Sequence, residues 1–182
     1  MIAISYTFKG LDKAIRWFET RPSVIQRAMD QSLMNGGNKV RTDVRRALMK
    51  VTGAKRYASI VNRTRSRYVG FHQAGVYVIY VKGGPMKLDE FRFRAGPHGI
   101  SAALWAVDRQ FKRSFVLPGK DASNPANFRA RLPGGSHSKL RRLYGPNLAK
   151  EATDGQPARV FLLSAREHVG QEMAKRLGKA MA

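Results

Sequence analysis

The side chains in this sequence with the clearest chemical capacity are two clusters of Lys and Arg. Residues 39–67 carry ten basic side chains with Asp43 as the single acid, and residues 109–142 carry nine with Asp121 as the single acid. The whole chain has 34 basic against 12 acidic side chains, a formal net charge of +22. Cationic groups in this excess neutralise phosphates, so the pattern predicts a polyanionic partner, above all nucleic acid held through its backbone.

Six of these side chains are our candidate nucleic-acid-binding residues. They are Arg41, Arg45, Arg46, Lys50, Arg141 and Arg142. Each of them taken alone reads as a solvated surface charge, but solubility requires only a mixed-sign surface, and two one-sign clusters exceed that need. The sequence leaves one alternative interpretation open, in which these arginines pair with acidic patches on neighbouring proteins.

Other chemistries lack the residues that they need. The chain has no cysteine, which excludes disulfides and thiolate metal sites within it. Its four histidines are far apart, its acids are few, and neither glycine-rich segment, 82–85 or 132–135, carries the Gly-Lys-Ser/Thr of a P-loop. We therefore expect no enzyme, no cofactor and no metal. A metal-dependent nuclease is kept as the weakest alternative because it would need several converging carboxylates.

The sequence also predicts no membrane partner. No apolar run approaches the roughly 20 residues that a spanning helix needs. Residues 1–8 alternate like a strand and lack the basic start and long apolar stretch of a signal peptide. We expect the protein to stay where it is made or to leave inside an assembly.

Helices must position the first basic cluster. After the strand at 1–8, apolar spacing predicts a short helix over 11–18, a long helix from about Pro22 to Lys50, and a short helix over 54–63. In the long helix the apolar stripe is separate from the basic side chains. The pair Gly36-Gly37 marks either a kink or a close approach by another backbone.

Strands must position the second cluster. Strands are predicted at 76–81, 88–94, 100–107 and 111–117, followed by an extended loop or hairpin over 120–138 around a short strand at 128–131. A final helix is predicted with Ser164 and Glu167 as its capping box. The order favours one α+β domain over 1–182, with N-terminal helices including one long helix, a mainly antiparallel sheet at 66–118, and a C-terminal helix.

Four stretches of the chain resemble the phage minor tail protein Z family, the tail completion proteins. They are the Gly-Leu opening at 8–14, the long helix through 28–46 with its Thr-Gly stop, the segment 114–119, and the Leu-Tyr-Gly-Pro segment within 140–148. The last of these is the most specific. At 114–119 the order of the residues differs from the order typical of the family.

The resemblance implies a structural virion protein at the head-proximal end of a tail, assembled in the host cytoplasm. It implies a homo-oligomeric, hexameric ring at the head–tail junction that contacts double-stranded DNA in its lumen. Its protein partners would be the tail terminator, the tail tube or tape measure, and neck proteins. Trp17 and Trp105 are candidate contact anchors, although core packing is the commoner role of such residues. The alternative, which rests on charge alone, is a cytoplasmic protein that binds nucleic acid without sequence preference.

Overall fold

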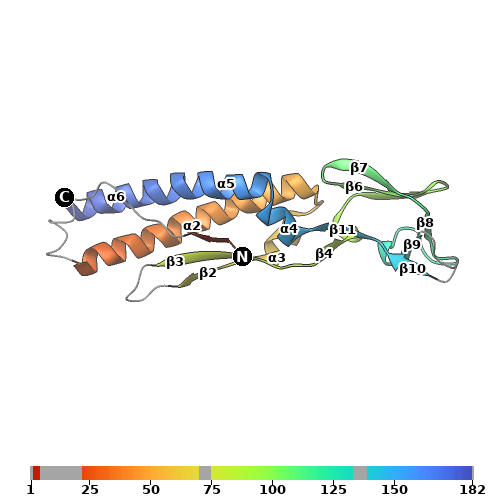
Figure 1. Cartoon of the computed structure of the whole chain (residues 1–182), viewed down its shortest axis with the longest axis horizontal. Coiled ribbons are helices and arrows are strands. Elements are labelled where there is room, and N and C mark those ends of the chain that lie inside the picture. The colour runs from red at the N-terminus through yellow and green to blue at the C-terminus, as the bar shows by residue number, and fades with distance from the viewer. Residues whose placement is uncertain (1, 5–21, 70–74, 133–138, 182) are drawn as a thin grey trace.

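The protein is built from two long helical layers, small antiparallel sheets and short connecting helices (Figure 1). The computed structural model describes residues 2–4, 22–69, 75–132 and 139–181. The predicted helix over 11–18, with Trp17, lies outside these residues, as does the part of the predicted loop at 133–138. The α+β class predicted from the sequence is confirmed.

The longest element is α2 (Pro22–Thr52), which confirms the predicted long helix and extends it by two residues. Its buried side includes Val40, Val44 and Leu48, which recur at helical spacing. The helix ends at Thr52 and is followed by Gly53, whose φ of 72° is a left-handed conformation that glycine adopts without strain. Met29, an apolar residue of this helix at the spacing of the predicted apolar stripe, is exposed rather than buried.

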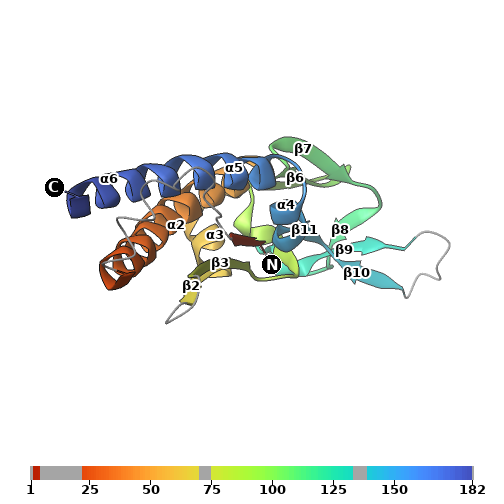
Figure 2. The same cartoon turned by 60° about the vertical axis from the view of Figure 1, so that its left-hand side comes forward.

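A second helical layer runs beside α2. It consists of α5 (Gln156–Ser164), a π-helical turn (Ala165–Val169) and α6 (Gly170–Met181), and it lies along α2 in both views (Figures 1 and 2). The predicted capping box is wrong, because Ser164 has helical φ and ψ and makes no capping bond. The helix instead begins at Gln156, with Pro157 in its first turn, where a missing N–H costs nothing.

The strands form four small sheets, and every pairing recorded among the described residues is antiparallel. Two sheets lie near the helices: β1 (Ile2–Ile4), β3 (Val76–Val81) and β2 (Thr64–Val69) form one in that order, and β4 (Pro85–Lys87) pairs with β11 (Tyr144–Asn147) in the other. The short helix α3 (Tyr57–Arg63) precedes β2, and α4 (Leu148–Thr153) follows β11.

The other two sheets lie at the opposite end of the molecule from the start of α2 (Figure 1). One contains β5 (Phe93–Gly96), β6 (Gly99–Leu104) and β7 (Val107–Phe111). The other contains β8 (Ser114–Val116), β9 (Phe128–Arg131) and β10 (Leu140–Arg142), in the order β10-β9-β8. The short strand predicted at 128–131 is confirmed, and strands extend on both sides of the predicted sheet region at 66–118.

Three predicted strands are shorter than the apolar runs indicated. The run 88–94 begins as a 3₁₀ turn over Leu88–Glu90, because the Glu90 carboxylate accepts a hydrogen bond from the Lys87 amide at 3.0 Å. The run 100–107 reverses at Trp105-Ala106, and the run 111–117 reverses at Arg113, all three with positive φ. None of these reversals contains glycine, so the usual sequence signal of a tight hairpin is missing.

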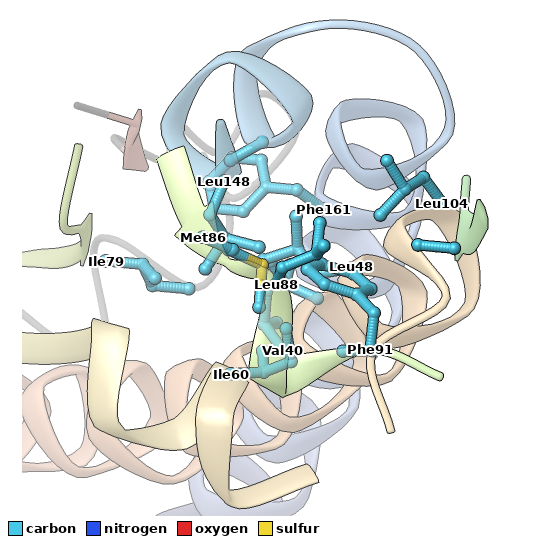
Figure 3. Close-up of a cluster of buried hydrophobic side chains, with 14 of the residues drawn as sticks. Val40, Leu48, Ile60, Ile79, Met86, Leu88, Phe91, Leu104, Leu148 and Phe161 are labelled. Atoms are coloured by element: carbon cyan, nitrogen blue, oxygen red, sulfur yellow. The ribbon is translucent and has the colours of Figure 1, made fainter. Parts of the chain in front are cut away.

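One cluster of buried hydrophobic side chains joins the helices to the sheets. Leu48 of α2, Ile60 of α3, Met86 of β4, Leu148 of α4 and Phe161 of α5 converge in it (Figure 3). Burial of each such side chain stabilises the fold by roughly 1.5–3 kcal/mol before entropy is counted. The cluster therefore sets how the basic parts of the chain are placed relative to one another.

Candidate nucleic-acid interface

Arg41 and Arg45 lie half-buried between α2 and β2. Arg41 Nη1 donates a hydrogen bond to Ser66 Oγ at 2.6 Å, and Arg45 Nη2 donates to the carbonyl oxygen of Thr64. Burial, and then the positive charge of Arg41, lower the pKa of the Arg45 guanidinium from its usual value. These two candidate residues therefore fasten the long helix to the sheet, and their donors are partly used inside the protein.

Arg46 and Lys50 occupy the exposed side of α2. Arg46 Nη1 lies 3.7 Å from Asp43 Oδ1, a loose ion pair on the helix surface that contributes little. Lys50 takes part in no ion pair recorded among the described residues. Of the four candidates on α2, these two are the ones open to an external anion.

Arg141 and Arg142 lie on β10, the edge strand of its sheet, and both are exposed. Arg142 also borders a hollow of about 170 Å³, which it shares with residues such as Lys87, Asp89 and Asn124. The ion pairs recorded among the described residues include neither arginine. Both guanidinium groups are therefore available to a partner.

The structure does not gather the six candidates into one site. The four α2 candidates lie in the C-terminal half of that helix, whereas Arg141 and Arg142 lie on β10, which is beyond the end of α2 at the β-rich end of the molecule in both views (Figures 1 and 2). The two clusters are therefore separate basic surfaces of one chain. A linear polyanion that touches both must run along the molecule or meet them on different subunits.

A polar cluster that the sequence did not reveal links the two helical layers. Asp43 Oδ2 of α2 accepts a hydrogen bond from Ser164 Oγ at 3.1 Å and lies 2.8 Å from His168 Nε2. Because both groups meet the same carboxylate oxygen, the serine hydroxyl is directed at Asp43 and not at the imidazole, unlike a catalytic triad. Asp43 and Ser164 are 121 residues apart in the chain, so no local motif could indicate this contact.

Trp105, one of the two candidate contact anchors, makes its contacts within the protein. Its side chain packs against the core, and its indole Nε1 donates a hydrogen bond to Glu151 Oε1 at 2.8 Å. The Arg109 guanidinium lies 4.6 Å from the centre of its ring. Trp105 therefore ties the β6–β7 turn to α4, which is the core role that the sequence favoured.

Two further findings concern metal ions and membranes in the residues that the structure describes. Within them, no three His, Cys, Asp or Glu side chains lie close enough together to hold a metal ion. No helix in the same part of the chain is long and apolar enough to span a bilayer.

The structure thus shows an α+β protein whose β10 strand and the outer side of α2 carry exposed basic side chains. Comparison with known proteins adds no relative: no family model matches the chain, and neither the curated proteins nor the solved structures give a significant match.

Proposed function

We propose that this chain is a non-enzymatic structural protein of a phage virion that completes the head-proximal end of the tail. It assembles into a hexameric ring at the head–tail junction. There it contacts the tail terminator, the tail tube or tape measure, neck proteins, and double-stranded DNA in the lumen.

The observation that carries this proposal is the segment at 140–148. It contains the Leu-Tyr-Gly-Pro sequence by which the chain resembles tail completion proteins, and it leads through β10 and β11 into α4 and the C-terminal helices. The same segment presents Arg141 and Arg142 to solvent. One short stretch therefore combines the family-like motif with exposed positive charge.

The net charge supports the DNA contact. A ring in which every subunit carries +22 would fill its lumen with a strong positive potential. Contacts to phosphates hold DNA without reading its sequence, as a conduit for a whole genome requires. The same charge supports the alternative of a cytoplasmic nucleic-acid-binding protein, so the site of action must be measured.

Particle composition tests the proposal. Tailed particles produced by the strain that encodes the chain would be purified on a density gradient, examined by mass spectrometry and imaged by cryo-electron microscopy. We expect the chain in the particles, as ring density at the head–tail junction. Its absence from purified particles would overturn the proposal. Co-sedimentation with ribosomes or free nucleic acid in low salt, lost in high salt, would then support the cytoplasmic alternative.

A further inference from the structure

The strand register assigns alternate side chains to the two faces of the small sheet β10-β9-β8, and all three residues of β10 are exposed. On one face, Ser114, Phe128 and Ala130 are buried. The opposite positions in the three strands place Phe115, Arg129, Arg131, Leu140 and Arg142 on the other face. We call these five residues the outer sheet face. Three of the five are arginines, and the three strands contain no acid.

Two arginines of this face stand directly opposite each other. In the antiparallel register, Arg142 of β10 pairs with Arg129 of β9, and Arg129 in turn pairs with Phe115 of β8. Like charges at opposed positions on neighbouring strands destabilise a sheet. Neither arginine belongs to an ion pair recorded among the described residues. An anion lying across the two strands would relieve this repulsion.

Two of the three guanidinium groups, those of Arg129 and Arg131, are held in place before any ligand arrives. Arg129 Nη1 donates hydrogen bonds to the carbonyl oxygens of Ala126 and Phe128 at 2.7 and 2.9 Å. The Arg131 guanidinium lies 5.6 Å from the centre of the Phe115 ring. Because these contacts restrict rotation, less conformational entropy is lost when the groups bind an anion.

We propose that the outer sheet face binds the phosphate backbone of nucleic acid, with Arg129, Arg131 and Arg142 as the contact residues. This proposal rests on the proposed function in taking DNA as the ligand, and it adds Arg129 and Arg131, which the sequence had not singled out. The charged side chains of this face are all positive, and its aromatic ring lies beneath an arginine. Such a face suits a linear polyanion, because the centres of protein interfaces are depleted of charged residues. It adds a DNA contact at the β-rich end to the exposed Arg46 and Lys50 of α2.

The salt dependence of DNA binding tests this assignment. The full chain would be titrated into a fluorescein-labelled DNA duplex of arbitrary sequence, by anisotropy, between about 50 and 200 mM salt. The double variant Arg131→Gln/Arg142→Gln should lower the slope of log K against log salt by about 2, since each phosphate contact contributes about 0.9. The double variant Arg131→Lys/Arg142→Lys, which keeps both charges, should retain most of the slope.

A matched control separates this face from net charge. Arg159→Gln/Arg166→Gln removes two exposed charges from the α5 side of the molecule, and it should change the slope by much less. Equal losses in the two glutamine variants would overturn the proposal, as would an unchanged slope in the sheet variant while the wild type binds. A lysine variant as weak as the glutamine one would overturn it too, because a structural defect would then explain both.

Two further outcomes distinguish the rival ligands. Labelled poly-glutamate serves as the probe for an acidic protein partner. If the sheet variant loses affinity for poly-glutamate but binds DNA as the wild type does, the proposal fails and the acidic-partner alternative replaces it. If the wild type binds no DNA even at low salt, the DNA contact in the proposed function fails together with this proposal.

Discussion

Gly36 of α2 lies directly against the backbone of Val169 in the π-helical turn. A Cβ atom at Gly36 would lie 2.8 Å from Val169 Cα and 3.0 Å from Val169 N. Its neighbour Gly37 faces the Tyr77 ring just as closely, with a Cβ to ring-carbon distance of 2.5 Å. Of the two roles that the sequence left open for this glycine pair, close approach is the one found, and at Gly36 the approaching group is a backbone.

Replacing Gly36 by alanine should lower the free energy of unfolding. Alanine favours the helix by about 1 kcal/mol, but a methyl group in this contact forces the two helices apart, at a cost of about 1–3 kcal/mol. Chemical denaturation would measure the net loss. The control Gly178→Ala, in α6 with open space around the added methyl group, should instead stabilise by up to about 1 kcal/mol. Equal stabilisation by both changes would contradict the close contact.

Asp43→Ala should weaken the link between α2 and the C-terminal helices. Ser164 and His168 then lose their shared acceptor, and we expect a loss near the lower end of about 1–3 kcal/mol because the groups are partly solvated. Asp43→Asn keeps an acceptor oxygen and should lose less. Asp108→Ala removes the same charge from an exposed position and should stay within about 0.5 kcal/mol. A loss in Asp108→Ala equal to that in Asp43→Ala would assign the effect to net charge.

Titration of Tyr68 should lower the free energy of unfolding at alkaline pH. Burial, and then its hydrogen bond to Asp30, raise the pKa of the Tyr68 hydroxyl from 10.0 to about 12. The unfolded chain releases this proton first, so the folded state binds more protons between these values and the free energy of unfolding falls as pH rises through that window. Below pH 10 the contribution is fully present.

The measurement for Tyr68 is the pH dependence of unfolding together with tyrosinate absorbance. Tyr68→Phe should flatten the decline between pH 10 and about 12 and should remove one late-titrating tyrosine from the spectrum. If the wild type and the variant titrate identically, the Tyr68 hydroxyl is not shielded as described.

Arg45 and Arg142 should respond differently to the same loss of charge. Arg45→Ala removes a charged donor to Thr64 O and a packed aliphatic stem, so we expect about 1–3 kcal/mol of lost stability. Arg142→Ala changes an exposed side chain and should stay within about 0.5 kcal/mol. Thermal and denaturant unfolding would measure the loss of stability in each variant. Similar losses in Arg45→Ala and Arg142→Ala would contradict the different roles given to Arg45 on α2 and Arg142 on β10.

The extent of correct prediction differs between helices and strands. The α+β class, the span of α2 and the strand at 128–131 follow from periodicity, because an amphipathic helix or strand records its buried side in its own sequence. The reversals at Trp105-Ala106 and Arg113 were missed, because their positive φ values occur at residues other than glycine, so the usual sequence signal of a tight turn is missing. The predicted capping box at Ser164 was wrong because the helix begins at Gln156 and continues through Ser164, whose hydroxyl instead donates to Asp43, far along the chain.

The sequence by itself determined the charge of the protein and which of its segments are basic. Only the tertiary structure decided what each cation does. Packing of α2 on β2 turns Arg41 and Arg45 inward, while the register of β9 and β10 brings Arg129 and Arg142 side by side on one exposed face. Charge is a property of composition, but burial and strand register depend on contacts between residues distant in the chain, which local patterns do not encode.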